Sequence, residues 1–447
     1  MKSNKYEIDM CNGSIMDKLV SFALPLMLSG ILQLMFNAVD IIVVGRFSGS
    51  EALAAVGSTT ALINVFTNLF IGISLGANVL AARFFAAGRK EEMSETVHTS
   101  ITLALISGIL MAFVGLVFSK GALELMGTPE DVIGLSTLYM RIYFMGMPFF
   151  MLYNYGAAIL RAVGDTKRPL YFLIIAGVIN AGLNMVLVIV FGLGVAGVGI
   201  ATVFSQMVSC VLVLTCLCRT EGSYKLSFSK LSMKGYYLKQ IFQVGIPAGI
   251  QSTVINFSNA LLQSSVNSFG STAMAGYTAA NNILGFLYVS INSVTQACMS
   301  FTSQNFGVGK YKRMDRVLID CMILSVGAAL VLGCAAYFFG AEILQIYTEE
   351  ADVIQCGVEI LSITTVPYFL CGIMDLFPGA LRGMGYSAVP MVLSIIGTVG
   401  MRVLWIFAFF PQHRSLYFLF ISYPASWIAT IVMQVVCYYF VRKHCYK

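Results

Sequence analysis

The chain has 447 residues, of which 58% are hydrophobic and only 11% are charged, and its formal net charge is +6. In soluble domains roughly a quarter of all residues are charged, so this composition excludes an ordinary soluble protein and indicates an integral membrane protein. The 11 cysteines lie mostly within apolar runs without metal-ligand spacing, which predicts neither a zinc site nor a disulfide framework.

Twelve apolar runs long enough to cross a bilayer follow one another along the chain. About 20 apolar residues span the hydrocarbon core as a helix, and helices satisfy their own backbone hydrogen bonds there. The predicted membrane-spanning helices are centred on residues 16–45, 52–81, 96–118, 132–159, 169–191, 193–218, 240–267, 273–302, 317–340, 353–380, 387–411 and 414–441. We therefore expect an all-α fold with twelve transmembrane helices.

The two halves of the chain repeat one another at a spacing of about 221 residues. Each half has six predicted spans, an even number, so both halves enter the membrane in the same direction. We predict two six-helix bundles related by a pseudo-two-fold axis along the membrane normal: an N-terminal lobe over 1–218, a cytoplasmic linker over 219–239 and a C-terminal lobe over 240–447. Matching positions include Leu24-Pro25 and Ile246-Pro247, Gly49–Ala54 and Gly270–Ala275, Leu160–Gly164 and Leu381–Gly385, and Pro169 and Pro390.

Lysines and arginines concentrate in alternate connections between the spans. With a cytoplasmic N-terminus, 22 of the 27 basic residues fall in inside segments and only three, Arg46, Lys120 and Arg414, in outside loops. The sequence therefore predicts a multi-pass protein of the cell inner membrane or plasma membrane with both termini in the cytoplasm. The same bias accounts for the net charge, so no nucleic-acid partner is expected.

One carboxylate falls within the first predicted span. Asp40 lies about 22 residues after Lys18, toward the outer part of the membrane. Inserting a carboxylate at the centre of a membrane-spanning helix costs ~2.5 to 3.5 kcal/mol, which favours a functional role for Asp40. The alternative is an interfacial residue near Arg46. Asn37 lies three residues earlier on the same helical face and is a candidate supporting polar group.

A second carboxylate, Asp375, falls in the tenth predicted span between Pro367 and Pro378. The prolines favour a bent helix with exposed carbonyl groups, which would support a polar site. The alternative is a residue at the cytoplasmic end of the span, seven residues before Arg382. Two arginines, Arg141 and Arg402, also fall within spans and receive no assigned role.

Several motifs in both halves resemble those of a known family. They are Pro25 with Asp40 and Val44-Gly45, then Leu53–Gly57, Leu160–Thr166, Gly197–Thr202, and Asp375 with Leu381-Arg382-Gly383. Together they resemble the MATE family, the multidrug and toxic compound extrusion transporters. The resemblance implies a secondary active exporter, not an enzyme, that exchanges H⁺ or Na⁺ for cationic or amphipathic small organic molecules by alternating access between two lobes. It implies no cofactor besides the coupling ion. We expect a monomer that is surrounded by membrane lipid.

The resemblance also implies a cation-coupling site in the N-terminal lobe. Its residues correspond to Asp40, Asn180, Asn184 and Thr202, and Asn184 stands where the family has a second Asp. Carboxylate, amide and hydroxyl oxygens suit a hard cation such as Na⁺, while protonation of Asp40 alone could equally couple a gradient. The alternative for the two asparagines is ordinary interhelical hydrogen bonding.

Another branch of the family pairs the Asp of the tenth helix with an acidic residue of the seventh. Here Asp375 is present, but residues 245–269 contain no Asp or Glu. We therefore expect Asp40 to be the main coupling residue and Asp375 to be secondary.

Three other functions are alternatives to export. A flippase for lipid-linked oligosaccharides or lipids, from the same superfamily, would be expected to line its cavity with several cations or to add spans. A membrane prenyl transferase would need Asp-rich Mg²⁺ motifs, which the sequence lacks. A passive channel would need no titratable residue within its helices. The sequence does not distinguish one organic substrate from another.

Overall fold

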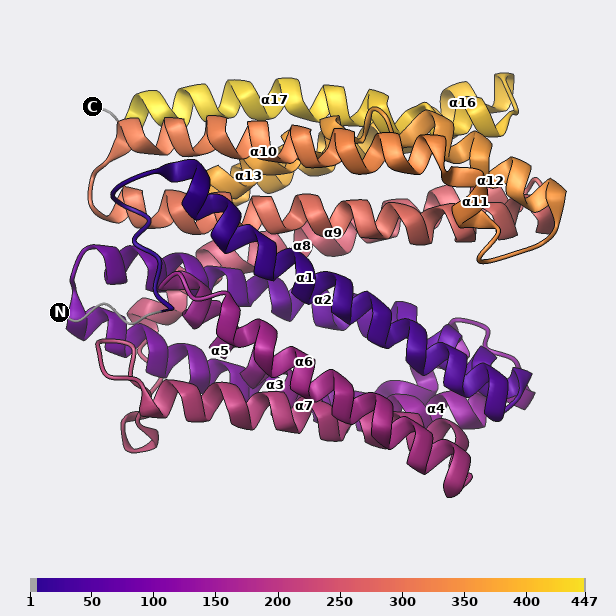
Figure 1. Cartoon of the computed structure of the whole chain (residues 1–447), viewed down its shortest axis with the longest axis horizontal. Helices are drawn as coiled ribbons and strands as arrows, with labels where there is room; N and C mark the ends of the chain where they lie inside the picture. Colours follow the sequence, from indigo (N-terminus) through magenta and orange to yellow (C-terminus); the bar gives the residue numbers. More distant parts are fainter. Residues whose placement is uncertain (1–5, 446–447) are drawn as a thin grey trace. The chain divides into compact units, whose positions relative to one another are not determined.

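The computed structural model describes residues 6–445, and every regular element in that range is helical (Figure 1). The first half contains α1 (Ile15–Phe47), α2 (Ser50–Ala86), α3 (Lys90–Leu125), α4 (Glu130–Met145), α5 (Met147–Ala162), α6 (Lys167–Asn184), the π-helical turn η1 (Met185–Val190) and α7 (Gly194–Arg219). The basic residues Lys2, Lys5 and Lys447, counted above, lie outside the described residues.

The second half repeats this pattern in more broken helices. It contains the short η2 (Phe228–Lys230), α8 (Gly235–Asn267), α9 (Ser271–Gly307), α10 (Tyr311–Phe338), α11 (Gly340–Leu344), α12 (Ala351–Thr364), α13 (Tyr368–Gly383), α14 (Ala388–Ser394), η3 (Ile395–Gly400), α15 (Met401–Leu404), η4 (Trp405–Phe409), η5 (Phe410–Gln412), α16 (Leu416–Phe420) and α17 (Ser422–Cys445).

Each of the twelve predicted spans corresponds to a helix or to a run of joined helices. Within residues 6–445, nine helices are long and apolar enough to cross a membrane, and α12 and α13, bent by 52° at their junction, together form a tenth candidate. The remaining two predicted spans, 132–159 and 240–267, fall on the pair α4 and α5 and on α8.

The chain folds into two compact units, and both boundaries cut through a helix. The first unit comprises Leu28–Gly249 with the residues up to Asp9, and the second comprises Met10–Met27 with the chain from Ile250 onward. The divisions thus fall at Met27 in α1 and at Gly249 in α8, each two residues after a proline within the helix, Pro25 or Pro247. The lobes predicted from the repeat are instead continuous stretches of the chain that end at 218 and begin at 240. These boundaries stay a prediction.

Small residues allow helices to pack closely within each unit. In the first unit, a Cβ on Gly76 of α2 would lie 2.1 Å from the carbonyl oxygen of Ile241 in α8. In the second, a Cβ on Gly333 of α10 would lie 2.3 Å from the carbonyl oxygen of Thr365. Such close approach is typical of helix packing in membranes. The hydrophobic effect does not drive helices together there, and small residues allow the close van der Waals contact that does.

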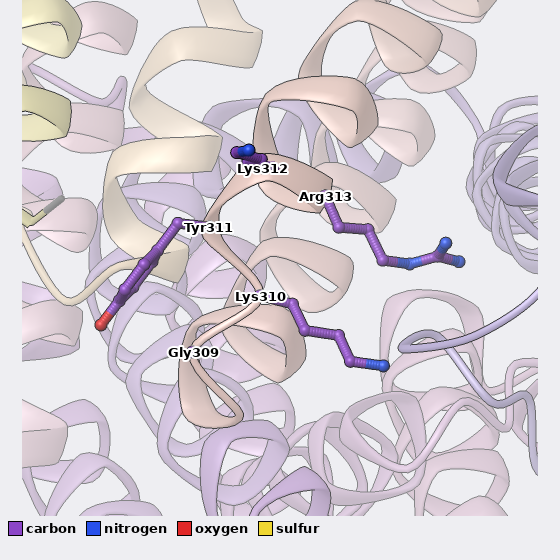
Figure 2. A pocket seen from close by; sticks show the side chains of 5 residues that line it. All are labelled: Gly309, Lys310, Tyr311, Lys312 and Arg313. Atoms are coloured by element: carbon purple, nitrogen blue, oxygen red, sulfur yellow. The ribbon is translucent and has the colours of Figure 1, made fainter.

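The segment that precedes α1 is held by the turn between α9 and α10, in the second unit. Lys310 Nζ donates to the Cys11 carbonyl at 2.9 Å, and Arg313 Nη2 donates to the Gly13 carbonyl at 2.9 Å. Figure 2 shows Lys310 and Arg313 extended to the same side of this turn, with the Tyr311 ring on the other. These contacts explain why residues 10–27 belong to the second unit although they begin the chain.

Candidate cation-coupling site

Asp40 is buried in the first unit, where side chains of α1 meet α6. The aromatic ring of Phe36, one turn before Asp40, lies directly against Gly177 of α6. A Cβ on Gly177 would be only 1.8 Å from Cζ of that ring. Asn180 and Asn184 lie three and seven residues after Gly177, on the same face of α6. The glycine therefore brings α1 to the face of α6 that carries both amides, and Asp40 is only 9% exposed.

The side chains predicted for this site contact one another. Asn184 Nδ2 donates to Asp40 Oδ1 and also to Asn180 Oδ1, the latter at 3.2 Å. The Thr202 side chain of α7 lies near the Asp40 carboxylate, and its hydroxyl donates to the Val198 carbonyl at 2.9 Å. Three helices thus bring Asp40, Asn180, Asn184 and Thr202 into one cluster.

Asn37 does not join this cluster. Its side chain is exposed, and within residues 6–445 it makes no hydrogen bond to the four residues above. The three-residue spacing placed it on the same side of the helix as Asp40. The direction in which α1 packs against its neighbours, however, buries Asp40 with Val43 and Val44 and leaves Asn37 outside.

Three polar residues near Asp40 were not found by sequence reasoning. Tyr139 and Tyr143 of α4 lie within electrostatic range of the Asp40 carboxylate, and Tyr143 is also near the Gln206 side chain of α7. Two signals could have identified them: the tyrosines are four residues apart on one face of α4, and Gln206 lies one turn after Thr202.

The cluster has more acceptor oxygens than donors. Asn184 Oδ1 and Gln206 Oε1 are buried without a hydrogen-bond partner in the described chain. No Lys, Arg or His in that part of the chain forms an ion pair with Asp40. A buried carboxylate without a counter-charge is costly, so an incoming proton or metal cation would be stabilised here. Among the described residues, no group of three His, Cys, Asp or Glu forms a metal site, so a cation at Asp40 would need amide and hydroxyl oxygens besides the carboxylate.

Asp375 in the second unit has different surroundings. It is half-buried on α13, and the guanidinium of Arg382, two turns later on the same helix, lies within its electrostatic range. Arg382 Nη2 donates to Gln251 Oε1 at 2.6 Å, and Tyr288, near both charges, accepts from Asn292 Nδ2 at 3.3 Å. The charge of Asp375 is therefore balanced in part by the protein itself, whereas that of Asp40 is not.

An all-helical membrane fold with an unpaired carboxylate buried among amides is typical of an ion-coupled transporter. The family model described as MatE matches residues 25–186 and again 247–407, so the chain belongs to the MATE family, as its motifs predicted. Because one model matches both halves, the internal repeat is confirmed as well.

Relatives and solved structures agree with this assignment. The chain is 31% identical over 434 residues to the probable multidrug resistance protein YoeA of Bacillus subtilis (strain 168), covering 94% of this chain and 93% of that one. It is 22% identical over 390 residues to the multidrug export protein MepA of Staphylococcus aureus (strain MSSA476), covering 87% and 86%. A crystal structure of MATE in complex with MaL6 superposes with a TM-score of 0.91 at 21% identity, covering 99% of both chains. The predicted fold of twelve helices in two bundles is thereby confirmed.

Proposed function

We propose that this protein is a secondary active multidrug exporter that exchanges H⁺ or Na⁺ for cationic or amphipathic organic compounds by alternating access between two lobes. The observation that carries the proposal is the Asp40 cluster, a carboxylate buried among amide and hydroxyl groups with no counter-charge within residues 6–445. The names of its relatives, which include multidrug resistance and export proteins, support the substrate class.

The cluster can accept either ion by a small rearrangement. Asn184 now directs its Nδ2 toward Asp40 Oδ1 and Asn180 Oδ1, while its own Oδ1 has no partner. Rotation of this amide would turn its oxygen toward the other two, and Thr202 could add its hydroxyl oxygen. Such a set of oxygens suits Na⁺. For H⁺ coupling, the proton would bind the carboxylate and the Asn184 amide would stay as a hydrogen-bond partner.

Asp375 has a secondary role in this proposal. Because Arg382 already lies within its electrostatic range, binding of an added cation there would disturb an existing charge balance. Loss of the Asp375 charge should therefore weaken transport without abolishing its dependence on the gradient.

The orientation that we propose places both termini in the cytoplasm. In the first unit, Tyr224 of the predicted linker donates to Glu7 at 2.7 Å, so two predicted inside segments meet. In the second unit, Arg442 Nη2 near the end of α17 donates to Asp315 of α10 at 2.7 Å, which again joins two predicted inside segments. The Asp40 cluster forms within one chain, so the proposal requires only a monomer.

Dye efflux from proteoliposomes tests this function. Ethidium, a permanent aromatic cation, would be loaded into vesicles with a pH gradient in Na⁺-free buffer, or with a Na⁺ gradient at equal pH. We expect one gradient to drive efflux, Asp40→Asn to abolish that response, and Asp375→Asn to reduce it only partly. A wild-type protein that responds to neither gradient would rule out the proposed exchange.

A further inference from the structure

A second charge is buried in the membrane-spanning part of the second unit. Arg402 lies in α15 and is only 3% exposed. Its Nη1 donates to Asn259 Oδ1 of α8 at 2.7 Å, its Nε donates to Ser426 Oγ of α17 at 3.4 Å, and its guanidinium lies 4.3 Å from the ring centroid of Tyr423. Contacts from α8 and α17 therefore hold this guanidinium in a fixed position.

No anion in the described part of the chain neutralises Arg402. Within residues 6–445, no carboxylate lies within ion-pair distance of it, and its Nη2 donates to no protein acceptor. Asn259 is half-buried, and because its Oδ1 accepts from Arg402, its Nδ2 is directed elsewhere and has no acceptor in the described chain. Two neighbouring donor groups, one of them charged, are thus left with unused hydrogen-bonding capacity.

The depth of Arg402 argues against a lipid headgroup as the missing partner. The run of joined helices that carries it extends from Ala388 to Gln412, and Arg402 lies near the middle of that run. At the rise of an α-helix, its backbone is about 20 Å from the first end and about 15 Å from the second, inside a hydrocarbon core of roughly 30 Å. Lipid phosphates lie at the surface of that core.

A polar face of α8 leads to this position. Asn256, three residues before Asn259 and on the same side of the helix, is exposed in the middle of the span. Exposed amides at this depth are unfavourable against lipid tails, so this face of α8 borders water or a polar ligand. A soluble compound can therefore approach Asn259.

The internal repeat relates this site to the Asp40 cluster. In the register that aligns Pro25 with Pro247, Asn259 corresponds to Asn37. In the register that aligns Pro169 with Pro390, Tyr423 corresponds to Thr202, and Arg402 corresponds to Ala181, which follows Asn180. Of these counterparts only Thr202 belongs to the Asp40 cluster, so the two buried charges occupy neighbouring, non-equivalent positions of the repeat.

We propose that Arg402 and Asn259 form a carboxylate-binding site for the transported compound, with Arg402 Nη2 and Asn259 Nδ2 as the donors. This inference rests on the proposed export function and extends it: the substrates would include zwitterions that carry a carboxylate besides their apolar or cationic part. Tyr423 and Ser426 are positioning residues, because they fix the plane of the guanidinium without contacting the ligand.

Benzoate and benzamide provide a matched pair of probes, equal in shape and different in charge. We would measure the thermal unfolding of the purified protein in detergent with each compound. At about ten times its dissociation constant, benzoate should raise the unfolding temperature by about 1.5 °C, and benzamide by less than about 0.5 °C. Arg402→Gln and Asn259→Asp should both abolish the response to benzoate, the second because the new carboxylate would itself pair with Arg402. Arg141→Gln, at an exposed arginine of α4, should leave the response unchanged.

Several results would overturn the proposal. They are an absence of stabilisation by benzoate in the wild-type protein, an equal response to benzamide, or an unchanged benzoate response in Asn259→Asp. If Arg402→Gln does not fold, Asn259→Asp decides, since it keeps the hydrogen bond to the guanidinium. The assay needs no ion gradient, so failure of coupled transport and failure of this site give separate results.

Discussion

Individual charges distinguish the two halves of this protein more clearly than their folds do. Within residues 6–445, Asp40 is buried beside amides without a cation, and Arg402 is a buried cation without an anion. Asp375, in contrast, shares its surroundings with Arg382. An unbalanced charge is where binding of an ion or ligand gains most free energy. We therefore expect the coupling ion at Asp40 and a substrate group at Arg402.

Asn184 should contribute to stability as well as to coupling. Replacing it by Leu leaves Asp40 Oδ1 and Asn180 Oδ1 without their shared donor. Each unsatisfied buried acceptor costs about 1–3 kcal/mol, so Asn184→Leu should lower the free energy of unfolding by about that amount or more. Asn37→Leu, at an exposed amide of α1, is the control and should cost less than about 0.5 kcal/mol. Unfolding in detergent with increasing denaturant measures both. Equal losses for the two variants would contradict the cluster.

Among the helices, the contact between α1 and α6 determines where Asp40 lies. Gly177→Ala would place a methyl group against the Phe36 ring, since the Cβ would lie 1.8 Å from it. Overpacking of this kind costs about 1–3 kcal/mol and should move α1 away from Asn180 and Asn184. We expect both lower stability and weaker gradient-driven transport.

Gly182 on the same helix provides the matched control. A Cβ there meets nothing within 4 Å, and replacing a helical glycine by alanine gains about 0.5–1 kcal/mol. Gly182→Ala should therefore leave transport unchanged and raise stability slightly. Thermal unfolding and dye efflux measured on both variants test the contact. Identical behaviour of Gly177→Ala and Gly182→Ala would show that the contact between Phe36 and Gly177 does not matter.

Sequence reasoning found the helices because long apolar runs determine membrane spans almost by themselves. It also pointed to Asp40 as a carboxylate within a span, and to Asn180, Asn184 and Thr202 through the resemblance to a family. It did not find the divisions of α1 and α8 near their prolines, the π-helical turns, or Tyr139, Tyr143 and Gln206. These features depend on which face of each helix packs against which neighbour, and a single sequence does not contain that information. Asn37 shows the same limit, because spacing alone placed it beside Asp40.

At the scale of the whole molecule, the distribution of basic residues predicts how the chain is inserted. In a cysteine-free background that still transports, His444→Cys after the last span should react with a membrane-impermeant maleimide only in permeabilised cells. Glu130→Cys, exposed at the start of α4 and predicted to face outward, should react in intact cells. Labelling of both positions in intact cells would contradict cytoplasmic termini, as would the reverse pattern.

A duplicated scaffold with unlike charges suggests a division of labour, in which one half responds to the ion and the other helps to hold the compound. This division requires that loss of Asp40 abolish ion-driven transport while substrate exchange continues. An exporter whose coupling residue is removed can still exchange substrate for substrate, because exchange needs no net ion movement.

The most direct test compares two assays of Asp40→Asn in the same proteoliposomes. One follows accumulation of ethidium against its gradient under an imposed pH or Na⁺ gradient, and the other follows exchange of labelled for unlabelled ethidium with no ion gradient. We predict that Asp40→Asn keeps exchange within about threefold of the wild type and loses accumulation by at least about tenfold. Accumulation equal to that of the wild type would show that Asp40 is not the coupling residue.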